Sequence, residues 1–347
     1  MPNNFPTLVV ADLGDSPSGG DRFHEQVARV WQRDLIRIRG SWPYPTMSER
    51  EQLTSTLTSV RGPVVLDGLL GCAGPNVLAH AHAQGARPWL LVHLPLAADC
   101  QSAAEAGELN CRERAALDLA AGVITTSEWS KADLVRRHGP RDVTVVEPGV
   151  ALPSTIEPRS AASPPHLVTV ASYTPRKNYG LLIAALAQIT DLEWQSTWAG
   201  AAPEGETRRL QELLHTHGLT DRVQMTGPLN DLEVSRLWRQ SDLLVFPSRF
   251  ETYGMVITEA LTHGIPAMVS ADTASEQTLA GPMGLLPGMA LSAQDPTAWA
   301  HSLRQWLVEP PVRESWGSWV AERNHHVRTW ETCAQDLAKT VGGHRVR

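Results

Sequence analysis

The sequence is poor in cysteine, a residue of many metal and redox sites. It has only four cysteines, at positions 72, 100, 111 and 333, and none of them forms a CxxC pair. Neighbouring histidines, such as His80 and His82, have no carboxylate or cysteine pattern beside them that would complete a metal site. We therefore interpret the cysteines as reduced thiols and these histidines as structural or solvated residues.

Two motifs of nucleotide-binding enzymes are also absent. GxGxxG does not occur, which removes the main support for a hydride-transferring Rossmann enzyme. No Asp-x-Asp triplet occurs either, so the usual carboxylate clamp for a metal-bound nucleotide sugar is missing. We expect a protein that needs neither a metal nor another cofactor.

Long apolar runs are missing as well. None reaches the roughly 18 to 20 residues that a membrane-spanning helix needs. The first residues, MPNNFPTLVVAD, lack a basic region followed by a long apolar segment, which argues against a signal peptide and predicts a cytoplasmic location. The formal net charge is −7 and the basic residues are scattered, which argues against nucleic acid as a partner.

What the chain does contain is typical of two globular α/β domains. Its 347 residues suggest two domains of roughly 150 residues each. A proline-rich segment without apolar periodicity, 151–165, predicts a linker between a domain at 1–150 and a domain at 166–322. Strands are predicted at 7–11, 64–67, 89–93, 123–126 and 143–146, and then at 167–171, 198–200, 223–227, 243–246 and 267–269. Helices are predicted at 22–35, 112–121, from 127, 181–187, 206–215, 231–239, 254–263, 297–307 and about 327–340.

The segment 243–270 organises this pattern, because it reads as strand, loop, helix and strand. Gly264 stands where a glycine commonly ends a helix. Two acids flank the start of the helix, Glu251 in the loop and Glu259 inside it. Glu259 follows Glu251 by eight positions, or about 10 Å if most of the interval is helical, which is too far for one metal ion or a shared proton. Two solvated glutamates would explain this pattern, and so would contacts to the two ends of an extended ligand.

The order of residues in this segment resembles the E(x7)E signature of the family-4 retaining glycosyltransferases. The match consists of Glu251, Gly254, Glu259, Ala260, Gly264 and Pro266. The resemblance implies a GT-B fold, in which two doubly wound Rossmann-like domains face each other across a cleft. It also implies that Glu251 faces the donor sugar and that Glu259 holds the ribose hydroxyls. The phosphates would then lie over the backbone N–H groups of Gly254, Met255 and Val256.

The first domain offers two further site candidates. Gly19 and Gly20 follow the first strand and resemble the paired glycines of the same family, where the missing side chains let the loop approach the donor phosphates and the acceptor. Considered alone, they also fit an ordinary surface turn. His93 ends a predicted strand, where ligands collect in α/β folds, and resembles the family's active-site histidine. A structural histidine is the alternative.

Two further features of the second domain match the family, and one departs from it. Arg176 and Lys177 occupy a strand-to-helix loop, where two cations would stabilise a leaving diphosphate, although a solvated loop also fits. Gly227 and Leu229 follow a strand and resemble the loop that packs against the nucleotide base. The family arginine expected at the end of the first strand of this domain is replaced by Ser172, so either Arg176 takes its place or diphosphate binding is weaker.

The resemblance implies transfer of a sugar from a UDP-sugar or GDP-sugar to a hydroxyl group, with retention of configuration and without a metal. It also implies that the helix at about 327–347 packs back on the first domain. The acidic chain argues against membrane association and for a small soluble acceptor. TPRK and RFETYGMV look like a subgroup that includes pterin glycosyltransferases. A nucleotide-sugar epimerase or hydrolase, or a non-catalytic nucleotide-sugar binder, remains an alternative, and nothing indicates the oligomeric state.

Overall fold

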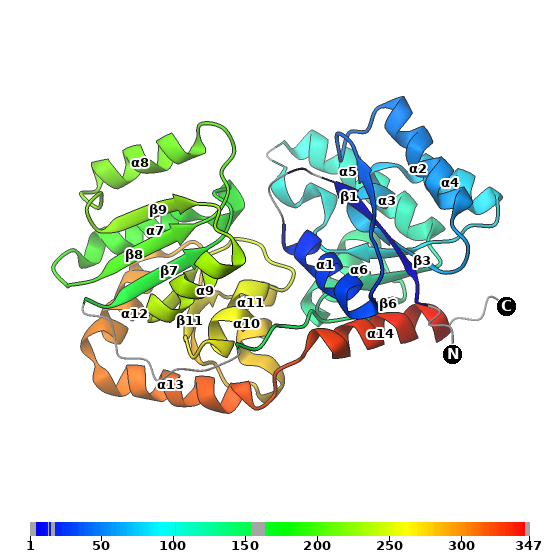
Figure 1. The fold of residues 1–347 in the computed structure, drawn as a ribbon. Coiled ribbons are helices and arrows are strands. Elements are labelled where there is room, and N and C mark those ends of the chain that lie inside the picture. Colours follow the sequence, from blue (N-terminus) through cyan, green and yellow to red (C-terminus); the bar gives the residue numbers. More distant parts are fainter. Residues whose placement is uncertain (1–4, 13, 15–17, 101, 154–163, 344–347) are drawn as a thin grey trace. The chain divides into compact units, whose positions relative to one another are not determined.

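The computed structural model describes residues 5–12, 14, 18–100, 102–153 and 164–343. The chain forms two compact units, which we call unit 1 (residues 1–149 and 328–347) and unit 2 (residues 150–327). Each unit contains a six-stranded parallel sheet with helices around it (Figure 1). Most of the predicted linker, 154–163, lies outside the described residues.

The sheet of unit 1 has the strand order β2-β1-β3-β4-β5-β6. Each neighbouring pair is parallel. Strands in such an arrangement are covered on both faces, which explains why they read as short, nearly continuous apolar runs. The strands are β1 (Thr7–Asp12), β2 (Ile36–Arg39), β3 (Val64–Asp67), β4 (Trp89–Val92), β5 (Gly122–Thr125) and β6 (Val143–Val145). The helices are α1 (Gly19–Trp31), α2 (Met47–Ser59), α3 (Gly68–Ala73), α4 (Pro75–Ala83), η1 (Leu96–Asp99), α5 (Ala103–Leu119), α6 (Glu128–His138) and α14 (Trp330–Gly343).

The first helix differs from its prediction at both ends. It was expected at 22–35, but α1 begins at Gly19, because Ser18 and Asp21 form a reciprocal capping box. It ends at Trp31, where Gln32 takes a left-handed conformation. Residues 36–39 then form β2, an edge strand that the sequence did not predict.

The last helix belongs to unit 1 although it follows unit 2 in the sequence. In Figure 1, α14 lies beside α1, red against dark blue. The indole N–H of Trp31 donates to the carbonyl oxygen of Ala334 (3.2 Å), and the rings of Phe23 and Trp330 meet edge to face with centroids 5.7 Å apart. Aromatic and backbone contacts thus hold α14 against α1.

The sheet of unit 2 has the order β12-β11-β10-β7-β8-β9, again with all neighbours parallel. Its strands are β7 (His166–Val170), β8 (Gln195–Ala199), β9 (Val223–Gly227), β10 (Leu243–Phe246), β11 (Ala267–Ser270) and β12 (Gly288–Leu291). Its helices are η2 (Pro175–Lys177), α7 (Tyr179–Leu186), η3 (Ala187–Ile189), α8 (Glu206–Thr216), α9 (Asp231–Gln240), α10 (Met255–Thr262), α11 (Ala274–Ala280), η4 (Gly281–Met283), α12 (Pro296–Val308) and α13 (Pro310–Asn324).

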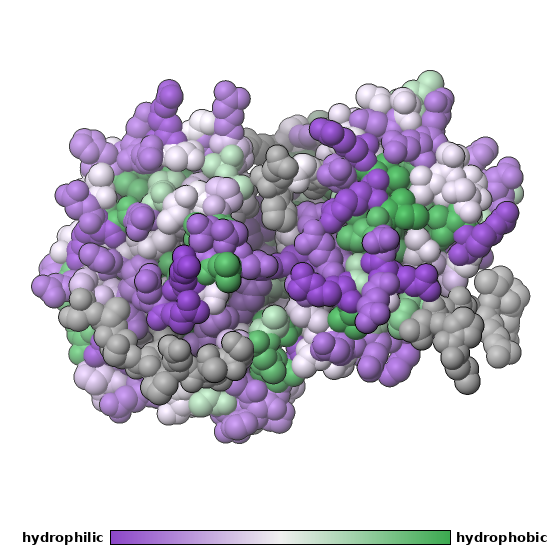
Figure 2. Space-filling model, in the orientation of Figure 1, coloured by the Kyte–Doolittle hydropathy of each residue, from purple (hydrophilic) through white to green (hydrophobic). Residues whose placement is uncertain are grey.

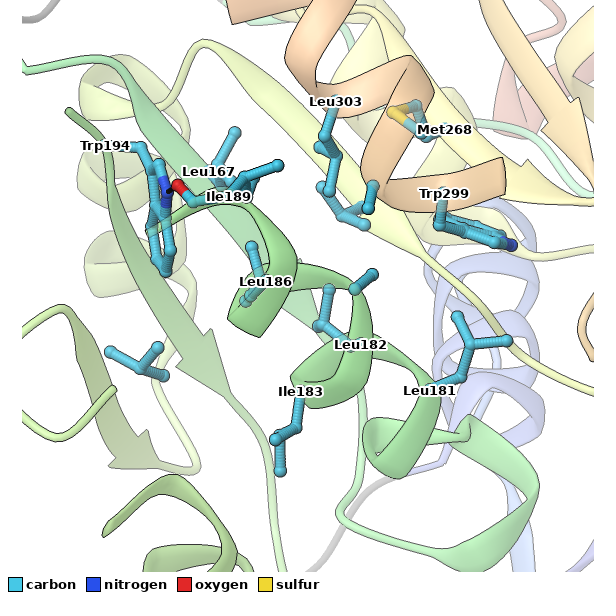
Figure 3. Packing of buried hydrophobic residues seen from close by; sticks show 14 of the residues in the cluster. Leu167, Leu181, Leu182, Ile183, Leu186, Ile189, Trp194, Met268, Trp299 and Leu303 are labelled. Atoms are coloured by element: carbon cyan, nitrogen blue, oxygen red, sulfur yellow. Dashed lines mark hydrogen bonds between the residues drawn. The ribbon is translucent and has the colours of Figure 1, made fainter. Parts of the chain in front are cut away.

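One core cluster of unit 2 lies between the sheet and the helices α7 and α12. Leu182 and Leu186 of α7 point toward Leu303 of α12, and Trp299 fills the end of the same layer (Figure 3). Trp299 and Leu303 are fully buried. Trp299, Trp306 and Trp330, on the last helices of the chain, are all buried.

The face drawn in Figure 2 is mainly hydrophilic, with hydrophobic residues in separate groups. Among the helices of the described residues, none combines the length and the apolar character needed to cross a bilayer.

Candidate active site

The strand orders place each candidate cluster at a topological switch point. In unit 2 the chain reverses direction across the sheet between the neighbouring strands β7 and β10, and in unit 1 between β1 and β3. Loops at the carboxyl ends of two such strands diverge and leave a crevice for ligands. In unit 2 these two loops carry Arg176, Lys177, Glu251 and Gly254.

Backbone contacts hold the two loops of unit 2 together. The N–H of Arg249 donates to the carbonyl oxygen of Arg176 (2.8 Å). Asn178 is buried, in a left-handed conformation, just before α7. Its amide donates to the carbonyl oxygen of Ala293 (2.9 Å), and its side-chain oxygen accepts from Arg249 Nε (3.0 Å). Asn178 therefore fixes the position of the loop that carries the two cations.

Glu251 accepts from both cations of the neighbouring loop. Arg176 Nη1 lies 3.2 Å from Glu251 Oε1 and 3.1 Å from the carbonyl oxygen of Phe250. Lys177 Nζ binds the same carboxylate oxygen and also lies 4.8 Å from the centre of the Phe246 ring. All three charged side chains are at most 15% exposed. The structure thus brings Glu251, Arg176 and Lys177 into one cluster with a formal charge of one positive unit.

The charge of Glu251 depends on those two cations. Burial alone would raise the pKa of the Glu251 carboxyl, but the charges of Lys177 and Arg176 outweigh it and hold that pKa below its usual value. The carboxylate is therefore ionised at neutral pH. A diphosphate that entered here would share the cations with Glu251, because phosphate oxygens and carboxylates compete for the same donors.

The helix that follows Glu251 begins where the sequence predicted. α10 runs from Met255 to Thr262, and Gly254 precedes it with φ of 83°. A side chain at Gly254 would meet both this left-handed backbone and Ile257 Cδ1 at 2.9 Å. Gly264 also has positive φ, 78°, as expected for the residue that ends the helix. Met255 and Val256 are half-buried in the first turn.

The remaining donor-binding candidates occupy neighbouring segments of unit 2. Glu259 is half-buried in α10, and Gly227 and Leu229 are half-buried at the end of β9 and in the loop after it. Gly227 has φ of 75° and its amide oxygen accepts from Gly200 N–H (2.9 Å). The sequence did not single out Gly200, where a Cβ atom would lie 1.9 Å from the carbonyl oxygen of Ala171. Glycine is required there for the strand ends to approach.

In unit 1, His93 follows β4 at the carboxyl edge of the sheet, and its ring faces a second histidine. Nε2 of His93 lies 3.0 Å from Nε2 of His24, which belongs to α1 and is 1% exposed. Burial is the main cause that lowers the pKa of each histidine to about 3. Arg37 adds to the lowering of the His24 pKa, and His24 adds to that of His93, whereas Asp67 and Asp21 oppose the shift at His93. Both rings are therefore neutral at physiological pH.

The paired glycines touch this histidine. Gly19 and Gly20 form the first turn of α1 rather than a loop before it. A Cβ atom on Gly20 would lie 3.0 Å from His93 Cδ2 and 3.3 Å from Cγ. The absence of a side chain at Gly20 thus makes room for the His93 ring, a reason that the sequence alone did not provide.

Asp67 is a further polar residue at the switch point of unit 1. It ends β3, accepts from Leu69 N–H (2.9 Å) as the cap of α3 and from Ala11 N–H (3.4 Å). Burial raises the pKa of Asp67, whereas the nearby His93 opposes the shift. Sequence reasoning placed Asp67 at the end of a strand but assigned it no role. Its position at the end of a predicted strand was the available signal.

A pocket opens elsewhere on unit 1, beside the segments that follow β2 and β3. It has a volume of about 440 Å³. Arg112, 16% exposed, donates to the carbonyl oxygen of Ala73 (2.6 Å) and lies 3.7 Å from Glu108. Arg50 donates through Nε to the carbonyl oxygen of Pro45 (3.3 Å). The pocket is lined by Tyr44, Pro45, Arg50, Ala73, Pro75, Asn76, Glu108 and Arg112. Two guanidinium groups and one carboxylate give it a positive balance.

Metal ligands do not gather in the part of the chain that the structure describes. No group of three or more His, Cys, Asp or Glu side chains there could hold a metal ion. Nearby pairs such as His24 and His93 offer fewer ligands than a structural or catalytic metal site needs.

Comparison with known proteins shows that the segment containing most of unit 2 is similar to glycosyltransferases. Residues 156–322 match the family model described as "Glycosyl transferases group 1". The "D-inositol 3-phosphate glycosyltransferase" of Corynebacterium diphtheriae is 25% identical over 374 residues, which covers 92% of this chain and 84% of that enzyme. The protein of the same name from Salinispora tropica is 27% identical over 259 residues, which covers 65% of this chain and 52% of that protein. Residues 156–322 are thus similar to the group 1 glycosyltransferases.

Solved structures share the fold across both units. Sucrose-phosphate synthase from Thermosynechococcus elongatus superposes with a TM-score of 0.76 at 18% identity and covers 97% of this chain and 98% of its own. Anabaena HepE, solved in complex with UDP and glucose, has a TM-score of 0.76 at 17% identity and covers 98% and 100%. The predicted fold class, α/β of the GT-B type with two doubly wound units, is confirmed.

Proposed function

We propose that this protein is a metal-independent retaining glycosyltransferase, which moves a sugar from a nucleoside-diphosphate sugar to a hydroxyl group of a small soluble acceptor. The observation that carries the proposal is the cluster of Arg176, Lys177 and Glu251 at the switch point of unit 2, directly before the N-terminus of α10. It lies inside the segment that matches the group 1 glycosyltransferases.

The proposed mechanism follows from the place where negative charge develops during the reaction, the leaving diphosphate. The bond between the anomeric carbon and the diphosphate oxygen breaks, and a new bond forms between that carbon and the acceptor oxygen. The two cations and the N–H groups of the α10 N-terminus, including those of Met255 and Val256, stabilise the negative charge of the leaving diphosphate. The acceptor proton goes to the departing phosphate oxygen, since the Glu251 carboxylate is already engaged by Arg176 and Lys177.

The donor contacts follow the E(x7)E resemblance. Glu251 would face the donor sugar, Glu259 would bind the ribose hydroxyls, and Gly227 and Leu229 would pack against the base. Arg176 would take the place of the family arginine that Ser172 replaces, and its position in the cluster, beside the Phe250 carbonyl oxygen and Glu251, supports this role. Gly19, Gly20 and His93 would contact the transferred sugar from unit 1. A UDP-sugar is the first donor to test, since a structural neighbour was solved with UDP and glucose.

The pocket lined by Arg50 and Arg112 suggests that the acceptor carries a negative charge. Arg112 is largely buried, and its nearest carboxylate, Glu108, is 68% exposed and 3.7 Å away. A partly desolvated guanidinium with such a weak partner favours an anionic group on the ligand. Relatives named D-inositol 3-phosphate glycosyltransferase point to a phosphorylated polyol. Pterins are the second acceptor class, on the likeness of TPRK and RFETYGMV.

The test is incubation with labelled UDP- and GDP-sugars, with and without a chelator, in the presence of a phosphorylated polyol, a pterin or a mixed extract. We expect a labelled acceptor product whose anomeric configuration, read by proton NMR, equals that of the donor. Conversion of the donor without acceptor would indicate an epimerase or hydrolase. Binding without any product would indicate a nucleotide-sugar-binding protein. Loss of transfer with the chelator would refute metal independence.

A further inference from the structure

The two neutral histidines of unit 1 form a pair whose proton arrangement is restricted by distance. Their Nε2 atoms lie 3.0 Å apart, with ring centroids 4.7 Å apart and planes inclined at 75°. At this separation one nitrogen must donate and the other must accept, because two N–H groups or two lone pairs would repel each other. One proton therefore lies between His24 and His93 while both are neutral.

The surroundings of His24 decide which ring donates. Its second nitrogen, Nδ1, is buried and has no hydrogen-bond partner among the residues that the structure describes. A buried N–H group without an acceptor is rarer in proteins than a buried acceptor without a donor. Nδ1 of His24 is therefore the bare nitrogen, and the proton of His24 sits on Nε2. His24 donates, Nε2 of His93 accepts, and a neutral His93 must carry its own proton on Nδ1.

The orientation of the His93 ring is restricted by the same helix. Phe23, the neighbour of His24 on α1, meets the His93 ring edge to face with centroids 5.0 Å apart. Gly20, one turn earlier, lies close enough that a Cβ atom would touch the ring. The other side of Phe23 packs on Trp330 of α14. Helix α1 thus lies against His93 at three positions of one face, Gly20, Phe23 and His24.

We propose that His24 is a positioning residue, which holds His93 in one orientation and in the tautomer protonated on Nδ1. This inference rests on the proposed function, in which His93 contacts the transferred sugar. A histidine in this state donates through Nδ1, so any oxygen that it contacts through that atom must accept. Without His24, the two tautomers of His93 would interconvert and part of the molecules would present the wrong group. His24 acts through His93 and does not touch the substrate.

Nitrogen NMR on the histidine-labelled protein tests the proton arrangement without any substrate. At pH 7 we expect His93 to show a protonated Nδ1 and a bare Nε2, and His24 to show the reverse. A protonated Nε2 on His93 would overturn the proposal. In folded His24→Phe, which keeps an aromatic ring but has no donor, the His93 signals should move toward a mixture of tautomers. Unchanged His93 signals in that variant would also overturn it.

Kinetics separate positioning from simple structural support. His24→Phe should lower kcat by about 10-fold, the value of one lost hydrogen bond, with a donor KM within about twofold of wild type. His24→Gln, whose amide can donate from nearly the same place, should restore most of the rate. A folded His24→Phe protein with wild-type kcat, or no gain in the glutamine variant, contradicts the proposal. If the wild-type protein transfers no sugar, the proposed function fails, and the NMR result still decides the tautomer.

Discussion

The candidate clusters of the two units occupy equivalent places in their sheets and use opposite electrostatics. In unit 2, two cations and one carboxylate share a partly buried site between β7 and β10. In unit 1, two neutral histidines are buried beside the switch point between β1 and β3. The charged cluster suits a ligand that arrives with its own charge. The neutral pair suits contacts with sugar hydroxyls, which need a donor or acceptor in a fixed direction.

This difference predicts that the two units lose stability in different pH ranges. A histidine with a native pKa of about 3 and an unfolded pKa of about 6.5 binds its proton only in the unfolded state between those values. Unit 1 should therefore lose stability as the pH falls below about 6.5. Glu251, with a lowered native pKa, stabilises unit 2 above its unfolded value and loses this effect only below about pH 4.5.

The expected loss in unit 1 is the largest effect that we predict. Each histidine contributes about 2 kcal/mol between pH 7 and pH 5, or about 4 kcal/mol together. The charge of Arg37 also lowers the pKa of His24 and so adds to this loss of stability. Asp67 and Asp21 favour protonated His93 and reduce the loss. Hydrogen exchange of the β4 and β10 amides at pH 7, 6 and 5 measures the two units separately. In His24→Phe the pH dependence at β4 should fall by about half, and an equal dependence in both proteins would contradict the assignment.

The next prediction concerns Glu251, whose removal leaves two largely buried cations without their carboxylate. Glu251→Ala should destabilise unit 2 by about 3 kcal/mol, as when one partner of a buried ion pair is lost. Urea unfolding followed at the β10 amides measures this loss. A nucleoside diphosphate should restore part of the stability, because its phosphates supply the missing negative charge.

Asp191→Ala is the matched control for Glu251→Ala within unit 2. Asp191 pairs with Arg304, but their side chains are 60% and 39% exposed. Water already solvates these charges, so the control should leave stability almost unchanged. Equal losses in the two variants would show that the Glu251 cluster is no more than a surface ion pair.

The two units also show which features could be predicted from the sequence: those with local signals could, and contacts between distant residues could not. The strands of unit 2 other than β12, and the helix that follows Glu251, were predictable, because apolar runs, Gly254 and Gly264 carry local signals. The pairing of Glu251 with Arg176 and Lys177 was not, since 74 or 75 residues separate the partners and the strand order was unknown. The same reason hid His24 as the partner of His93, 69 positions away. The edge strand β2 was missed although its alternating isoleucines and arginines are themselves a signal for a half-buried strand.

Catalysis should depend on the charged cluster more than donor binding does. Lys177→Ala should lower kcat by roughly 100-fold, with a smaller change in donor KM, because charge on the leaving diphosphate grows in the transition state. Steady-state kinetics with a UDP-sugar measures both constants. Lys339→Ala, which removes a lysine that is 77% exposed, should leave them unchanged. A rise in KM with intact turnover would mean that Lys177 only binds the donor.

The smallest effect compares two glycines at matching positions. Gly20 and Gly180 are each the second residue of the helix that follows the first strand of their unit. A Cβ atom on Gly180 would meet nothing within 4 Å, so Gly180→Ala should stabilise unit 2 by about 0.5 kcal/mol through the unfolded chain. Gly20→Ala would gain the same entropy, but its Cβ atom would press on His93, which Phe23 and His24 hold from other sides. We therefore expect Gly20→Ala to be neutral or destabilising within about 1 kcal/mol and to disturb the His93 NMR signals. Equal stabilisation by both alanines in urea unfolding would show that the His93 ring moves freely, and the rigid neutral pair of unit 1 would then have to be abandoned.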